Sequence, residues 1–204
     1  SYSLNREQKV KSFQFSTTGD HLMAVLENNQ IQVINTRDLS TVNRFDFGVD
    51  IDKLVSCPDG QRALCIGAKS HFIFDIKTGK QSVTFGQHGN LSGDGGFNLT
   101  GDRYLSIPDD IDEMAVLYDA DTGKIIKELP NGGSDGEKQA ENEEQFNSDD
   151  VITDYFRPRA VFGPDNRLLV TLFKDLTIRV FNARDGELLG AVEQRAINFD
   201  ISPD

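Results

Sequence analysis

Apolar residues come in short runs along the chain, and a tight turn follows each run. The segments FQFSTTGD (13–20), LVSCPDG (54–60), FNLTGD (97–102) and VFGPDN (161–166) all have this form. The turns contain Gly, Pro, Asp and Asn, which favour tight reversals of the backbone. Because no segment keeps a helical period of apolar positions, the pattern predicts β-strands joined by turns and almost no helix.

The same order of runs and turns occurs four times. If Gly19, Gly60, Gly101 and Asn166 are equivalent, the spacings between them are 41, 41 and 65 residues. A second apolar run follows each of these turns, and a third run ends in an apolar residue followed by Asp or Asn. A further turn and a fourth strand complete each repeat. Four short strands in a period of about 41 residues are typical of propeller blades.

The third run of several repeats is almost continuously apolar or β-branched. Examples are IQVIN (31–35), HFIFD (71–75) and TIRVF (177–181). Such strands make a sheet with two apolar faces, and one four-stranded sheet cannot bury both by itself. The sequence therefore predicts four sheets stacked face to face.

The turn SCPDG, the endings Phe-Asp and Tyr-Asp of the third strand, and the period together resemble the WD-repeat β-propeller family. The resemblance covers about residues 8–204 except a long insert. It implies a hydrogen-bonded tetrad of His, Ser or Thr, Asp and Trp in a blade. The third repeat matches with His88, Ser106, Asp112 and Tyr118, the tyrosine standing in the place of Trp.

The other repeats depart from this tetrad. The fourth repeat keeps Thr171, Asp175 and Phe181, but Thr153 stands where the His would be. The first two repeats have lost the set, and the chain has no Trp. Propellers of the bacterial YVTN type and of quinoproteins are therefore alternative relatives.

The repeats define the expected domain organisation of an all-β propeller. We expect blades over residues 10–47, 48–86, 87–130 and 155–194, a flexible insert over 131–154, and the start of a fifth blade over 195–204. Residues 1–9 form the outer strand of a preceding blade or a tail. Propellers usually contain four to eight blades, so we expect a segment of a larger propeller of about seven. The alternative is that two four-blade halves close as a dimer.

The insert is strongly acidic. Residues 131–150 contain seven acidic residues and one Lys, so they carry −6 of the net charge of −12. The family resemblance implies that loops leaving the fourth strand lie on the face that binds partners. Acidic residues there, Glu143 and Glu144 among them, would steer a basic partner and raise its association rate. The alternative is a solvated loop without a role.

Aromatic and Arg side chains follow the insert at Tyr155, Arg157 and Arg159. These residue types are frequent in binding hot spots, so they are candidates for contact with a partner. The alternative is that Phe156 packs inward and the arginines pair with neighbouring acids.

The overall charge excludes some ligand classes. A pI near 4.6 argues against nucleic acid or an anionic membrane as the main ligand. The sequence lacks an apolar stretch of the roughly 18 residues that a membrane-spanning helix needs. Together with two cysteines that cannot form a disulfide framework, this favours a cytoplasmic location.

No motif predicts a catalytic, metal or cofactor site. The segment Asp119–Gly123 lacks most ligands of a calcium loop, and the Thr-Gly-Lys triplets at 78–80 and 122–124 lack the remainder of a phosphate loop. The three histidines are scattered, and there is no Gly-x-Ser-x-Gly sequence. We therefore expect a protein that is not an enzyme and holds no cofactor.

The expected function is a protein-interaction scaffold within a larger protein or assembly, which binds proteins or peptides through the face that carries the insert. One alternative is a regulatory propeller in a nucleotide-switch protein with a NACHT-type ATPase. A second is an enzyme-type propeller similar to quinoproteins.

Overall fold

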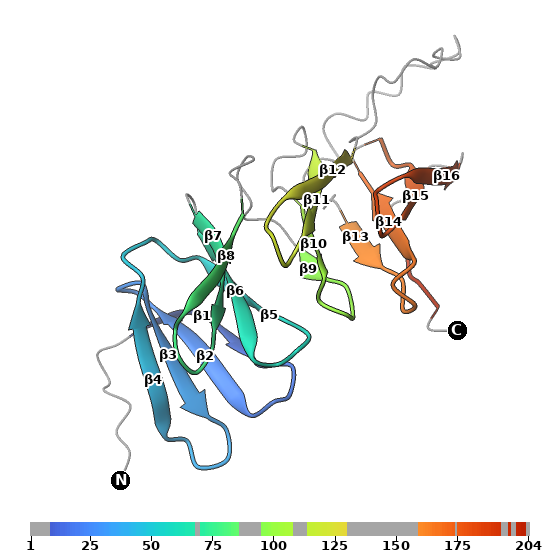
Figure 1. Ribbon diagram of the computed structural model, residues 1–204. Helices are drawn as coiled ribbons and strands as arrows, with labels where there is room; N and C mark the ends of the chain where they lie inside the picture. The colour runs from blue at the N-terminus through green and yellow to red at the C-terminus, as the bar shows by residue number, and fades with distance from the viewer. Residues whose placement is uncertain are drawn as a thin grey trace, which may run out of the picture.

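The computed structural model describes residues 9–67, 70–85, 95–107, 114–129, 159–173, 175–192, 196 and 199–202. These residues form sixteen strands and no helix. The strands make four antiparallel sheets of four strands each, and in each sheet the strands follow one another in chain order. The sheets are arranged side by side as the blades of a propeller (Figure 1), which confirms the fold predicted from the repeats.

The first two sheets come from the N-terminal part of the chain. Their strands are β1 (Val10–Phe15), β2 (His21–Leu26), β3 (Gln30–Asn35), β4 (Thr41–Asp46), β5 (Lys53–Ser56), β6 (Arg62–Gly67), β7 (Ser70–Asp75) and β8 (Gln81–Thr84). The third and fourth sheets contain β9 (Gly96–Phe97), β10 (Arg103–Ser106), β11 (Ala115–Asp119), β12 (Ile125–Leu129), β13 (Arg159–Phe162), β14 (Leu168–Leu172), β15 (Ile178–Asn182) and β16 (Leu188–Val192).

The turn between the first and second strand has the same conformation in all four sheets. Gly19, Gly60, Gly101 and Asn166 have φ values of 73°, 67°, 75° and 59°. Glycine and asparagine tolerate this left-handed region better than other residues, which explains why the sequence punctuates each repeat with them. In each turn, the N–H of this residue donates a hydrogen bond of 2.8–3.1 Å to the carbonyl three residues earlier.

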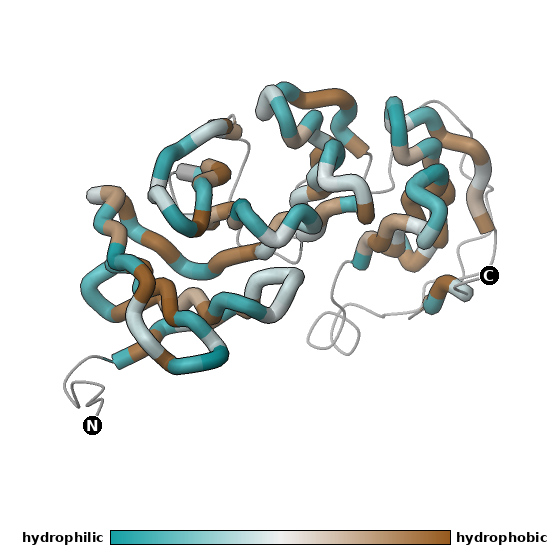
Figure 2. The backbone as a smooth tube through the Cα atoms, turned by 60° about the horizontal axis from the view of Figure 1, so that its bottom comes forward, coloured by the Kyte–Doolittle hydropathy of each residue, from teal (hydrophilic) through white to brown (hydrophobic). Residues whose placement is uncertain are grey.

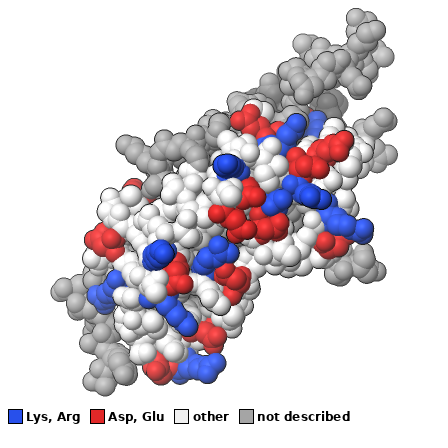
Figure 3. Space-filling model, viewed as in Figure 1, with Lys and Arg blue, Asp and Glu red and all other residues white. Residues whose placement is uncertain are grey.

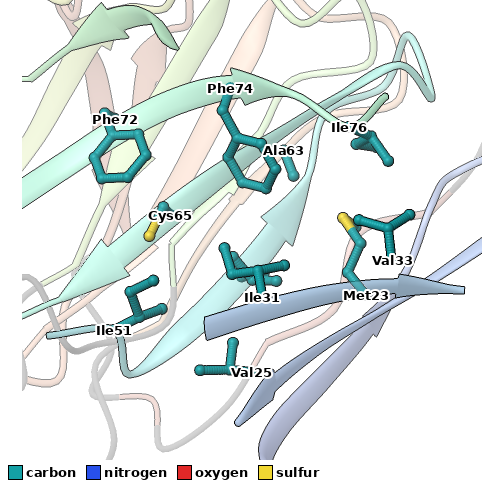
Figure 4. Packing of buried hydrophobic residues seen from close by; sticks show 11 residues of the cluster. Met23, Val25, Ile31, Val33, Ile51, Ala63, Cys65, Phe72, Phe74 and Ile76 are labelled. Atoms are coloured by element: carbon teal, nitrogen blue, oxygen red, sulfur yellow. The ribbon is translucent and has the colours of Figure 1, made fainter. Parts of the chain in front are cut away.

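Each pair of consecutive sheets encloses an apolar core. We call the face that a sheet turns to the next sheet its forward face, and the opposite face its back face. In the first core, Met23, Val25, Ile31 and Val33 on the forward face of the first sheet meet a back face that includes Ala63, Cys65, Phe72 and Phe74 (Figure 4).

The second and third cores repeat this arrangement. In the second, Leu64, Ile66 and Ile73 pack against Tyr104, Val116 and Tyr118. In the third, Leu105, Ala115 and Leu117 pack against Leu169 and Phe181. Hydrophobic residues lie mainly in the strands and hydrophilic residues mainly at the turns (Figure 2). Stacking therefore buries the sheet faces that one sheet alone would leave in water.

The first strand of each sheet is its inner strand. Between the first two sheets, Ser12 Oγ donates to the carbonyl of Asp52 at 3.0 Å, and Thr17 Oγ1 donates to the carbonyl of Cys57 at 2.7 Å. In both pairs the residues are 40 positions apart, close to the repeat period. These bonds fix neighbouring sheets to each other at their inner edges.

Candidate interaction surfaces

The loops of the sheet stack gather at two ends. The turns between the first and second strands and between the third and fourth strands lie at one end, which we call the turn end. The turns between the second and third strands and the connections from sheet to sheet lie at the other, which we call the insert end. The chain leaves β12 at Leu129 and enters β13 at Arg159. Leu129 and Arg159 therefore lie at the insert end, and the acidic residues 131–150 fall between them in the sequence.

Two residues of the proposed tetrad, Ser106 and Tyr118, lie on the back face of the third sheet. Both are fully buried against the second sheet. Ser106 Oγ and Tyr118 OH have no hydrogen-bond partner among the described residues. His88 and Asp112 lie outside the described residues, so the tetrad of the third repeat stays a prediction.

In the fourth repeat, the three residues that match the tetrad each have a different environment. Thr171 is buried on the back face of the fourth sheet, and its Oγ1 has no partner within the described ranges. Asp175 lies in the turn before β15, where its Oδ1 accepts a hydrogen bond from Arg179 Nη1 at 3.0 Å and its Oδ2 pairs with Nη2. Phe181 packs in the third core. The structure thus brings Asp175 to Arg179 and not to Thr171.

Of the candidate residues for partner contact, only Arg159 is described. It is the first residue of β13, and its Nη1 donates to the carbonyl of Phe199 at 3.1 Å. Its guanidinium also lies 5.4 Å from the centre of the Phe199 ring. Tyr155, Arg157, Glu143 and Glu144 lie outside the described residues.

His71 is a buried polar residue that the sequence pattern did not single out. It is 3% exposed, and neither ring nitrogen has a hydrogen-bond partner in the described part of the chain. Burial lowers the pKa of His71 below its ordinary value of 6.5, against a smaller opposite effect of Asp52. An alignment of the repeats could have identified His71. It stands on the third strand at the position where the first and fourth sheets have Ile31 and Ile178.

Charged residues at the turn end bond mainly to each other. Arg103 Nη1 lies 3.1 Å from Asp102 Oδ2 and 3.5 Å from Asp119 Oδ2, and its Nε donates to the carbonyl of Arg184. The hydroxyl of Thr100 and the amide of Asn98 lower the pKa of Asp102. Arg103 links the third sheet to the fourth through its bond to Arg184. Acidic and basic side chains are intermingled on the face seen in Figure 3.

The cysteines are not activated as nucleophiles. Cys57 and Cys65 are free, and burial raises the pKa of each thiol to about 12. They lie in different cores, Cys57 in the second and Cys65 in the first. The described ranges contain no group of three metal-ligating side chains and no helix that is long and apolar enough to cross a membrane.

Known proteins share the fold of this chain, but none of the matches shows its function. No protein-family model matches the chain, and no curated protein matches it in sequence. Among solved structures, it is similar to a chain in the crystal structure of a mitotic checkpoint complex. The identity is 14% and the TM-score is 0.65, and the match covers 94% of this chain and 55% of the other.

This likeness shows the fold alone, because the identity is low. The chain spans about half the length of the chain that it matches. In total, 1310 chains of solved structures match, so the architecture is common and does not select a function by itself. The four antiparallel sheets and this match together show a β-propeller fold.

Proposed function

We propose that the chain is a non-catalytic WD-repeat scaffold that binds proteins or peptides at its insert end. The observation that carries the proposal is the position of Leu129 and Arg159, the ends of two strands that belong to sheets with a shared core. In the sequence, the acidic residues 131–150 fall between these two strand ends. A rigid sheet stack that presents a strongly charged connection is suited to recruiting a partner.

The charge of this connection favours a basic partner. Its seven acidic residues are accompanied by one Lys. The acidic connection therefore contributes a long-range attraction for basic segments. Such attraction raises association rates and weakens as salt screens it, over about 8 Å at physiological ionic strength.

The domain organisation is part of the same proposal. We assign blades to residues 10–47, 48–86, 87–130 and 155–194, with an insert over 131–154 and a further blade beginning at 195–204, within a larger propeller. The similar chain belongs to a multi-protein complex, which supports a role in an assembly. The free thiols support a cytoplasmic location. Neither the ATPase-linked nor the quinoprotein-like alternative has a supporting observation within the described ranges.

The test is a replacement of residues 131–150 by a Gly/Ser linker of the same length. The probe is a fluorescein-labelled peptide of alternating Lys and Gly-Ser units, and its binding is followed by fluorescence anisotropy at low and physiological salt. We expect the replacement to raise the dissociation constant at least tenfold and to leave the melting temperature unchanged, because the cores lie elsewhere.

A second variant separates charge from sequence length. In it, the seven acids become Asn or Gln and every other residue is kept. This variant should bind as weakly as the linker variant. If both variants bind the peptide as tightly as the original chain does, the insert is not a binding element and the proposal is wrong.

A further inference from the structure

The inner strand of the third sheet lacks a side chain at a position where the other three inner strands have one. This strand, β9, contains only Gly96 and Phe97, and Gly96 pairs with Leu105 of β10. Because directly paired residues of antiparallel strands point to the same side, Gly96 lies on the forward face together with Leu105. The corresponding residues of the other repeats, five positions before the left-handed turn residue, are Gln14, Val55 and Val161.

The backbone does not require a glycine at position 96. Its φ lies outside the left-handed region, and a Cβ added there meets no atom within 4 Å. Gly95 is different, because a Cβ at that position would overlap the carbonyl oxygen of Leu105. In the second sheet, Val55 fills the position of Gly96 and packs against the second core. The missing side chain at Gly96 therefore leaves space between the third and fourth sheets.

This space is a cavity of about 460 Å³ at the inner edge of the third core. Its walls come from β9, from β13 of the fourth sheet and from residues 200–202, and the volume lies in the range of small-molecule sites. The third and fourth sheets are neighbours within the stack, so a further sheet before the first or after the fourth would not fill the space between them. Most of the lining side chains are apolar, among them Phe97, Leu99, Leu105, Ala160, Phe162 and Ile201.

Asp200 carries the one charge among the described lining residues. Its side chain is exposed, and its Oδ1 accepts a hydrogen bond of 2.9 Å from the N–H of Ile201. Within the described ranges, no Lys or Arg forms an ion pair with it. The cavity thus combines apolar walls with one carboxylate, which suits a ligand that has an apolar body and a cationic group.

We propose that this cavity binds a small aromatic amine, with its ring between the third and fourth sheets and its ammonium group at Asp200. The ring makes the apolar contacts that are missing at Gly96, and it lies near the rings of Phe97 and Phe162, which favour edge or offset contacts with another ring. The ammonium group donates a charge-assisted hydrogen bond to the carboxylate. The site lies at the inner edges of two sheets and not at the insert end, so it goes beyond the proposed function.

The probes for this site are 1-naphthylmethylamine and its neutral analogue 1-naphthylmethanol. Their naphthyl fluorescence reports binding to the full chain with little protein background, because the chain has no Trp. We expect the amine to bind with a dissociation constant below about 1 mM. The alcohol should bind about threefold to fivefold more weakly, as expected for an ion pair at an exposed carboxylate. Asp200→Asn should remove this difference and leave the affinity for the alcohol unchanged.

Two glycine substitutions of the same kind separate the cavity from general effects on the chain. Gly96→Ile fills the cavity with a branched side chain and should weaken the binding of both probes at least about tenfold, with a melting temperature that is unchanged or higher. The control is Gly190→Ile on β16, where an added Cβ also meets no atom within 4 Å, and it should leave binding unchanged. Circular dichroism verifies the fold of each variant.

The exposed position of Asp200 keeps the test valid even if Gly96→Ile folds poorly, because Asp200→Asn leaves the cores untouched. The proposal is overturned if the original chain binds neither probe, if a folded Gly96→Ile variant binds both as the original chain does, or if the alcohol binds as tightly as the amine.

Discussion

Leu39 adopts a backbone conformation that the other three repeats reserve for glycine. It lies in the turn between β3 and β4 with φ 59°, and its N–H donates to the carbonyl of Asn35 at 2.9 Å. Gly79, Gly123 and Gly186 hold the equivalent turns with φ values of 71°, 70° and 74° and the same hydrogen bond. Leu39 is 68% exposed, so its side chain contributes little burial to offset the strain.

We therefore expect Leu39→Gly to stabilise the fold. The left-handed conformation costs about 1–2 kcal/mol for a residue with a Cβ, and glycine costs about 0.5–1 kcal/mol of extra chain entropy. The difference is a gain of about 0.5–1 kcal/mol in the free energy of unfolding, or about 1–4 °C in melting temperature for a domain of this size. Urea unfolding followed by circular dichroism measures it.

The matched control is Gly19→Ala. Gly19 has φ +73°, and a Cβ added there meets no atom within 4 Å. Its substitution therefore reports backbone strain alone and should lower the free energy of unfolding by about 1 kcal/mol. If Gly19→Ala destabilises the chain while Leu39→Gly leaves it unchanged or weaker, the reasoning about Leu39 is refuted.

The remaining predictions concern the cores. Because the pKa of His71 is lowered in the folded chain, the unfolded chain binds more protons as the pH falls below about 6.5. The stability that neutral His71 contributes is thus complete above that pH and is lost below it, and His71→Ile should flatten this dependence in urea unfolding between pH 5 and 8. His88→Ala and Asp112→Ala should each cost about 1–3 kcal/mol if the tetrad of the third repeat forms, and unchanged thermal unfolding of both would contradict it. Phe74→Ala, in the first core, should cost about 3–5 kcal/mol in the same assay, and a cost below 1 kcal/mol would contradict the stacking of the first two sheets.

The repeat made most of the fold predictable from the sequence. The left-handed turn positions at Gly19, Gly60, Gly101 and Asn166 fix where each hairpin reverses, and the period of two along a strand then assigns each residue to a face. The apolar runs of the third strands correctly indicated sheets buried on both sides. The left-handed conformation of Leu39 was not predicted, although Leu39 in the turn TRDLS stands where the Thr-Gly-Lys turns have Gly79 and Gly123.

The polar contacts were less predictable, because they depend on which of several charged groups is nearest. The tetrad pattern indicated Asp175 as a partner for a histidine, but the fourth repeat has Thr153 at that position. In the structure Asp175 pairs with Arg179, four residues further along. A pattern of residue types gives the position of a carboxylate, whereas the geometry of the turn decides which cation reaches it.

The salt dependence of peptide binding tests the electrostatic part of the proposed function separately from the fold. If the acidic residues of 131–150 attract a basic peptide, its affinity should fall as salt screens the charges, and the variant in which the seven acids become Asn or Gln should lose most of this dependence. Titrations at low and physiological salt with both proteins measure the difference. An equal salt dependence in the two proteins would mean that the attraction comes from other acidic residues, and the assignment of charge to the insert would be wrong.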